Sequence, residues 1–132
     1  MTKTTEERDQ QDFQDYVMAW RERLAQQAGQ QRVRAQDLQQ IARACARLLI
    51  QDFGARKVYL FGSLLDEERV HDRTDIDLAV EGLDGKLYFK ALSEIWKLLP
   101  AEVELDLVRL ERAWPALAER VTREGKVLDV AA

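Results

Sequence analysis

Three aspartates and a Gly-Ser pair have the residue types and the spacing that could do chemistry. Asp75 and Asp77 flank Ile76 in a segment that alternates acidic and apolar residues, which is typical of a β-strand. Residues two apart in a strand project from the same face, so we expect both carboxylates on one face, roughly 7 Å apart at their Cα atoms. They repel each other unless a cation lies between them, and Mg²⁺ binds carboxylate and phosphate oxygens together. The alternative is a strand that merely begins with solvated acids.

The third aspartate, Asp106, lies in a second alternating segment, residues 103–108. The apolar residues of this segment face one way, and Glu104 and Asp106 face the other. A carboxylate in an otherwise apolar strand is costly if it is buried and unpaired. A neighbouring strand that carries Asp75 and Asp77 would give Asp106 a cation to share. Three aspartates on one sheet face would suit a two-metal site for phosphoryl or nucleotidyl transfer.

Gly62 and Ser63 follow a short β-rich run, Val58–Phe61. Glycine lets a phosphate approach the backbone closely, and the N–H groups of a following helical turn can hold phosphate oxygens together with the Ser63 hydroxyl. Gly-Ser turns are common, so this pair indicates a phosphate site only in combination with the aspartates.

The elements that must position these residues follow from the periodicity of the chain. Apolar residues recur with helical spacing on both sides of Gly29, which predicts two helices, the second one capped by Gly54. After Gly54 the pattern predicts an α/β layered unit. Its expected strands are residues 58–61, 75–80, 103–108 and 126–130. Its expected helices are residues 86–99 and 115–124. We therefore expect an N-terminal helical extension over residues 1–54 and an α/β unit over residues 55–132.

Composition excludes several classes of function. The net charge is −4 and the pI is about 5.1, so no basic excess drives direct binding to nucleic acid. Cys45 and His71 are the only residues of their kinds, which excludes an internal disulfide, a cysteine-cluster zinc site and a His-rich metal site. No apolar run approaches the roughly 20 residues that span a bilayer, and the polar N-terminus is unlike a signal peptide. These features predict a cytoplasmic protein without a membrane partner.

The motifs together resemble one family. The matching residues are LFGS at Leu60–Ser63, DIDLAV at Asp75–Val80, Asp106 within LDLV, and REGKVLDV at Arg123–Val130. This combination resembles the minimal nucleotidyltransferase (MNT) domain of the polymerase β-like nucleotidyltransferase superfamily. The resemblance implies an α/β fold in which helices flank a mixed β-sheet. It also implies a catalytic and metal-binding role for Asp75, Asp77 and Asp106, with Mg²⁺ as the cofactor, and binding of the triphosphate of ATP by Gly62 and Ser63.

The resemblance further implies a reaction and a partner. Small MNT proteins are often the antitoxin (MntA type) of a pair with a HEPN-domain toxin ribonuclease, and they transfer AMP from ATP to a hydroxyl of that toxin. The sequence leaves open whether the protein forms a homo-oligomer.

One departure from the family pattern supports an alternative. Relatives often continue Gly-Ser with an arginine and a further glycine, whereas this chain continues with Leu64-Leu65 and three acids. Arg69, Arg73 or Lys57 could replace the missing positive charge. The alternative is a catalytically weak or inactive MNT-fold antitoxin that neutralises its partner by binding, with Phe13 and Trp20 as the anchor. Nucleotide transfer to a small molecule is less favoured, because it generally requires an additional substrate-binding domain.

Overall fold

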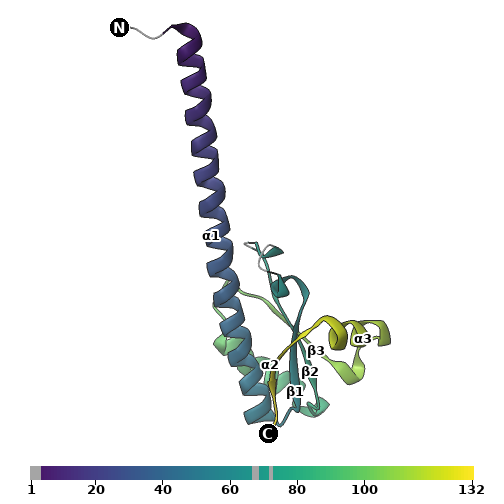
Figure 1. Cartoon of the computed structure of the whole chain (residues 1–132). Helices are drawn as coiled ribbons and strands as arrows, with labels where there is room; N and C mark the ends of the chain where they lie inside the picture. Colours follow the sequence, from purple (N-terminus) through teal and green to yellow (C-terminus); the bar gives the residue numbers. More distant parts are fainter. Residues whose placement is uncertain (1–3, 67–68, 72) are drawn as a thin grey trace.

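The computed structural model describes residues 4–66, 69–71 and 73–132. Its elements are one long helix, four strands, two shorter helices and several 3₁₀ turns (Figure 1). The helices are α1 (Thr5–Phe53), α2 (Tyr88–Leu98) and α3 (Pro115–Glu124). The strands are β1 (Lys57–Phe61), β2 (Ile76–Glu81), β3 (Leu105–Arg109) and β4 (Lys126–Val130).

Helix α1 corrects one expectation, because residues 5–53 form a single helix and Gly29 does not divide it. It begins at a capping box, in which the Thr4 hydroxyl accepts from the Glu7 N–H and the Glu7 carboxylate accepts from the Thr4 N–H. It ends at Gly54, whose φ of 72° is left-handed. A helical glycine costs only about 1 kcal/mol relative to alanine, which a helix of this length tolerates.

The sheet has the strand order β3-β2-β1-β4. Strand β1 is antiparallel to both of its neighbours, whereas β2 and β3 are parallel. A parallel pair requires a crossover connection, and α2 provides it. The mixed sheet with flanking helices confirms the predicted fold class.

The helices lie on two faces of the sheet (Figure 1). The C-terminal part of α1 and α2 pack on one face and enclose the main hydrophobic core. Helix α3 covers the opposite face at β1, where Val121 packs against Tyr59 and Ala79. On β2 and β3 the residues of the core face alternate with those of the α3 face, which carries the aspartates.

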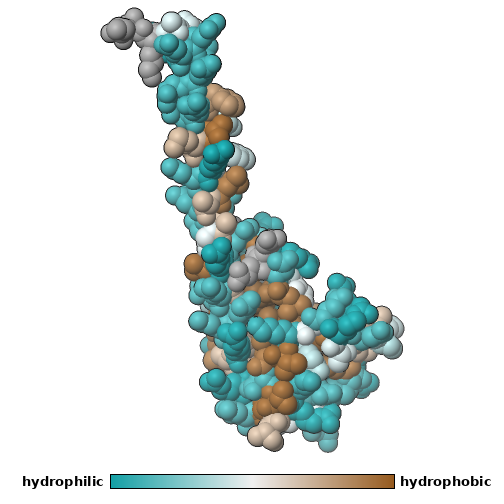
Figure 2. Space-filling model, in the orientation of Figure 1, coloured by the Kyte–Doolittle hydropathy of each residue, from teal (hydrophilic) through white to brown (hydrophobic). Residues whose placement is uncertain are grey.

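The N-terminal part of α1, residues 5–34, contains no buried residue and extends beyond the sheet (Figures 1 and 2). We call this part the projecting half. Burial begins at Ala35, and from there the helix belongs to the core.

None of the helices in the described part of the chain is long and apolar enough to cross a membrane.

Candidate nucleotide-binding site

Asp77 and Asp106 lie side by side on the α3 face of the sheet. They are direct partners in the register of the parallel strands β2 and β3, and Phe61 of β1 is opposite Asp77 on the other side. Their neighbours Leu105 and Leu107 are buried in the core, whereas Asp106 is exposed and Asp77 is half-buried. The alternation predicted from the sequence therefore holds, and it aims both carboxylates away from the core.

The electrostatics of Asp77 reflect this crowding of negative charge. Partial burial, followed by the charges of Asp106 and Asp75 and a hydrogen bond with Asp106, raises the pKa of Asp77 to about 6. Two neighbouring carboxylates disfavour the state in which both are ionised, so one of them keeps its proton to a higher pH than an isolated carboxyl group in water does. A divalent cation relieves the same repulsion, so these hard oxygen donors fit a magnesium-type ion.

Asp75 lies immediately before β2, which begins at Ile76 and not at residue 75 as expected. It is close enough to influence the pKa of Asp77. As the side chains stand, however, the described residues contain no group of three or more His, Cys, Asp or Glu that could hold a metal ion. The structure thus pairs Asp77 with Asp106 and places Asp75 at their edge.

The Gly-Ser turn lies directly against this pair. Strand β1 ends at Phe61, and Gly62 and Ser63 open a 3₁₀ turn that extends to Leu65. Gly62 has a φ of 80°, and a Cβ at this position would collide with the carboxylate of Asp77. The positive φ favours glycine, and any Cβ here would push the Asp77 carboxylate out of its present position. The turn and the aspartates, which are distant in sequence, therefore form one site.

Two hollows open beside this site, and both have Phe61 and Leu117 in their linings. One, of about 510 Å³, lies over Asp77 and Asp106 and extends to Trp96 of α2. The other, of about 250 Å³, lies beside Gly62 between the 3₁₀ turn and α3.

The second hollow contains the positive charge that the Gly-Ser segment lacks. Its lining includes Arg69 and Arg120. Arg69 is one of the three substitutes considered from the sequence, whereas Arg120 was missed. No sequence pattern indicates that Arg120 lies beside Gly62, because α3 is far from the Gly-Ser segment along the chain.

The other two candidate substitutes do not line this hollow. Lys57 begins β1 at the end opposite Gly62, with its Nζ 5.1 Å from the centre of the Tyr59 ring. Arg73 is exposed in the loop before β2, where its backbone N–H donates to Nδ1 of His71. Within the 250 Å³ hollow, Arg120 pairs with Glu124 at 3.2 Å, and a hydrogen bond from this arginine lowers the pKa of Glu124.

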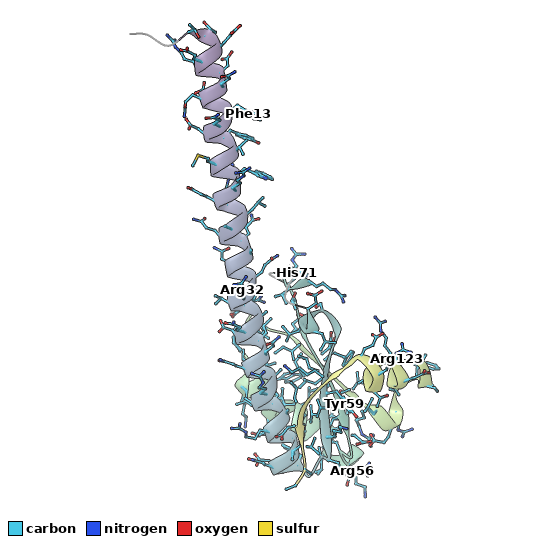
Figure 3. All side chains as sticks on the ribbon, in the orientation of Figure 1. Phe13, Arg32, Arg56, Tyr59, His71 and Arg123 are labelled. Carbon is cyan, nitrogen blue, oxygen red and sulfur yellow. The ribbon has the colours of Figure 1, made fainter. Side chains whose placement is uncertain are left out.

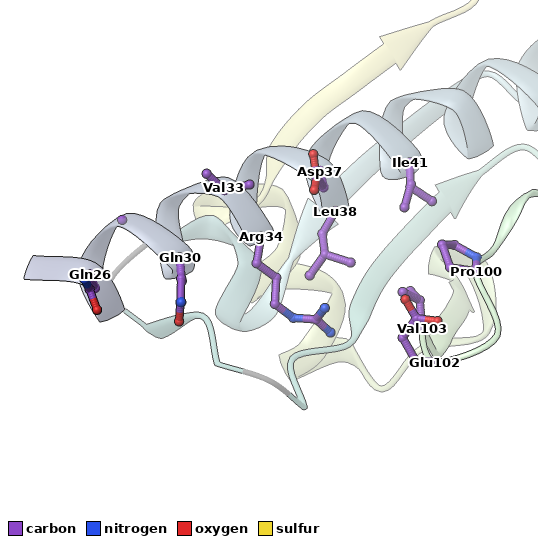
Figure 4. A pocket seen from close by; sticks show the side chains of 11 residues that line it. Gln26, Gln30, Val33, Arg34, Asp37, Leu38, Ile41, Pro100, Glu102 and Val103 are labelled. Atoms are coloured by element: carbon purple, nitrogen blue, oxygen red, sulfur yellow. The ribbon is translucent and has the colours of Figure 1, made fainter. Parts of the chain in front are cut away.

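A further hollow, of about 540 Å³, lies between α1 and the segment before β3 (Figure 4). It is on the α1 side of the sheet, because its buried members Leu38 and Val103 belong to the main core. Its charged lining residues are Arg34, Asp37 and Glu102, and the glycine in its lining, Gly29, lies within α1 and not in a turn that could receive phosphate. It is therefore separate from the aspartate site.

The single cysteine and histidine lie outside the site. Cys45 is buried in the core, and burial raises the pKa of its thiol to about 11, which makes it a poor nucleophile. His71 is exposed in the loop before β2, where its backbone N–H donates to the hydroxyl of Thr74. Both observations favour structural roles.

The fold is a mixed β-sheet flanked by helices, and its site is a glycine turn that lies against two paired aspartates. Together they place the protein in the nucleotidyltransferase class of α/β proteins. The family model "Polymerase beta, Nucleotidyltransferase" matches residues 39–129, which is most of the chain. The protein belongs to this polymerase β nucleotidyltransferase family. The match begins within α1, before the boundary expected from the sequence.

Solved structures support the same fold. A structure described as a toxin-antitoxin with AMP-PNP is 28% identical, with a TM-score of 0.54, over 67% of this chain and 73% of that chain. A structure described as the toxin-antitoxin MntA-HepT is 26% identical, with a TM-score of 0.50, over 70% and 73% of the respective chains. No protein with a curated description shows significant sequence similarity.

Proposed function

We propose that this protein is an antitoxin of the MNT type that transfers AMP from ATP to a hydroxyl group of a HEPN-domain toxin. The observation that carries the proposal is the register pairing of Asp77 with Asp106, directly against Gly62. A nucleotidyltransferase family match and similarity to toxin-antitoxin structures, one of them with AMP-PNP, support it.

Each part of the site has a chemical role in this reaction. Asp77 and Asp106, with Asp75 at the edge, would hold Mg²⁺, which when bound neutralises the triphosphate and aligns it. The N–H groups of the turn at Gly62 and the Ser63 hydroxyl would hold phosphate oxygens. Arg69 and Arg120 would add positive charge on the other side of the turn.

The transfer step balances without a further reactant. The oxygen of the acceptor hydroxyl attacks the α-phosphorus of ATP and forms a new P–O bond. The bond between the α-phosphorus and its bridging oxygen to the β-phosphorus breaks, and pyrophosphate leaves. The carboxylate of Asp106, which is exposed, accepts the proton of the hydroxyl. Most of the rate gain would come from positioning and charge neutralisation.

The hollow over the aspartates suits an acceptor carried by another protein. It lies at the edge strand β3, and it is bordered by Trp96, which is 60% exposed. An exposed aromatic beside a site is a common anchor in protein interfaces. A side-chain hydroxyl of the toxin can thus approach Asp106 from this edge.

The test is transfer of α-labelled AMP from ATP to the HEPN protein encoded beside this chain's gene, with Mg²⁺ present. The wild-type protein is expected to label the toxin, and Asp77→Asn to abolish labelling. Asp37→Asn, an exposed aspartate on α1, is the matched control and should label normally. No labelling by the wild type, or labelling that Asp77→Asn leaves intact, would contradict the proposal.

The acids after Gly62-Ser63 favour a second candidate, neutralisation of the toxin by binding alone. Asp66 is exposed, and the two glutamates that follow it lie outside the described residues. In this case Asp77→Asn would still neutralise the toxin, whereas Trp20→Ala would not. Calorimetric titration with ATP and Mg²⁺ separates the candidates, because saturable binding favours the enzyme.

A further inference from the structure

The projecting half of α1 carries an apolar stripe that nothing in the described structure covers. The stripe is Phe13, Val17, Trp20 and Leu24, which recur at spacings of four, three and four. Phe13 is 68% and Trp20 is 50% exposed. Figure 3 labels Phe13 on the part of the helix that extends beyond the α/β unit. This spacing is that of a two-helix seam, in which the apolar positions of one helix pack between those of another.

We propose that the stripe pairs with the same stripe of a second copy of this chain, in antiparallel orientation. Val17 would then lie across from Trp20 of the second copy, and Phe13 across from its Leu24. The stripe is symmetric about the point between residues 18 and 19, so both copies present the same seam to each other. A closed two-fold pairing of one surface with itself is the commonest form of homo-oligomer.

The charges of the projecting half select this orientation. The stretch before the stripe centre, residues 6–15, holds five acidic residues and one arginine, whereas residues 21–32 hold three arginines and one glutamate. A parallel pair would place the acidic stretches side by side and the basic stretches side by side. An antiparallel pair places residues 6–15 alongside residues 22–31, which hold one arginine and one glutamate and have Arg21 and Arg32 at their two ends, so the acidic stretches no longer face each other. Arg23, whose guanidinium carbon is 5.7 Å from the centre of the Trp20 ring, borders the seam in each copy.

The length of the projecting half also fits. Pairing about the stripe centre places the helix start at Thr5 of one copy alongside Arg32 of the other. The pair therefore uses the whole projecting half and stops where burial against the α/β unit begins, at Ala35. A hollow of about 290 Å³ marks this junction, and its lining includes Gln27, Gln31 and His71.

The stripe also has the right direction on α1. At 100° per residue, Trp20 and Leu24 lie within roughly 40° of the line that Leu38, Cys45 and Leu49 follow in the core. The side of α1 that packs against the α/β unit thus continues along the projecting half, where no other described element covers it. Met18, which is 60% exposed, lies on a different side of the helix and is a matched control.

The first test is the mass of the full chain in solution, by light scattering and sedimentation. The expected mass is twice the chain mass of 15.3 kDa. Trp20→Glu is expected to give the monomer, and Met18→Glu to leave the dimer intact. A monomeric wild type, including one that forms a complex only with the toxin, would overturn the proposal, as would equal effects of the two variants.

The second test fixes the orientation with engineered cysteines, because the native thiol of Cys45 is buried and gives little background. Under mild oxidation, a mixture of Phe13→Cys and Leu24→Cys chains is expected to form the mixed disulfide. Neither variant alone is expected to cross-link. Cross-linking of Phe13→Cys with itself would indicate a parallel pair and would contradict the antiparallel arrangement.

Discussion

At the scale of single residues, Asp77 is the group whose protonation should control the site. Its pKa is raised to about 6, above that of an aspartate in an unfolded chain, so in the absence of a cation its ionisation destabilises the fold. The stability that protonated Asp77 contributes is therefore present at low pH and is lost as the pH rises through its pKa of about 6.

A prediction for Mg²⁺ follows, because protons and cations compete for the same carboxylates. Mg²⁺ should raise the Tm little at about pH 5 and clearly more at about pH 7.5, once Asp77 is ionised. Thermal unfolding with and without Mg²⁺ at both values measures this effect. Asp77→Asn should remove the difference, and a Tm shift that is equal at both values would contradict the assignment.

A side chain at Gly62 should disturb the site, because the φ there is positive and a Cβ would displace the carboxylate of Asp77. Gly62→Ala is expected to abolish ATP binding, measured by calorimetry. The matched control is Gly29→Ala, a helical position with nothing within 4 Å, which should increase stability by up to about 1 kcal/mol. Normal ATP binding by Gly62→Ala would show that the turn is not part of the site.

Arg120 should contribute to binding of the triphosphate from α3. Arg120→Ala is expected to weaken ATP binding by about tenfold or more, because a hydrogen bond to a charged group contributes roughly 1.5–3 kcal/mol. The control is Arg123→Ala, an exposed arginine of the same helix that does not line the hollow. Inorganic tripolyphosphate should compete with ATP in the wild type and only weakly in Arg120→Ala. Equal ATP affinities of the two variants would remove Arg120 from the site.

At the scale of elements, α1 has two halves with different energetics. Leu49 is fully buried in the core, and Met18 lies on the projecting half. Leu49→Ala is expected to lower the free energy of unfolding by about 2–5 kcal/mol, and Met18→Ala by less than about 0.5 kcal/mol. Urea unfolding measures both changes. Similar losses for the two variants would contradict the division of the helix.

The elements also explain how much of the fold could be predicted from the sequence. The bounds of α3 and β4 agree with prediction, because Pro115 begins the helix and Gly125 separates it from the strand. The break expected at Gly29 was wrong, because the stripes before and after Gly29 lie on one side of a continuous helix. The presence of Gly29 alone does not show whether the apolar residues before and after it lie on the same side of one helix.

The candidate site was predicted in part for a related reason. Alternation within β2 and β3 correctly gave the faces of Asp77 and Asp106, since it is local. Which strands are neighbours, and that Arg120 of α3 lies beside Gly62, depends on tertiary packing. Sequence periodicity alone does not contain that information.

At the scale of the whole molecule, the site and the apolar stripe are in different places. The site lies on the α3 face of the sheet, whereas the stripe lies on the projecting half of α1. The chain carries a net charge of −4, so the arginines at the site must offset the general repulsion of anionic ATP. Substitutions in the stripe should therefore change assembly and leave ATP binding unaltered.

The most direct test of the central claim is a crystal structure of the protein with Mn²⁺ and a non-hydrolysable ATP analogue. Anomalous density for the metal is expected between the carboxylates of Asp77 and Asp106, within coordination distance of an oxygen of each. The triphosphate is expected to lie along Gly62 and Ser63. Metal bound away from both aspartates, or an analogue that binds elsewhere on the protein, would contradict the claim.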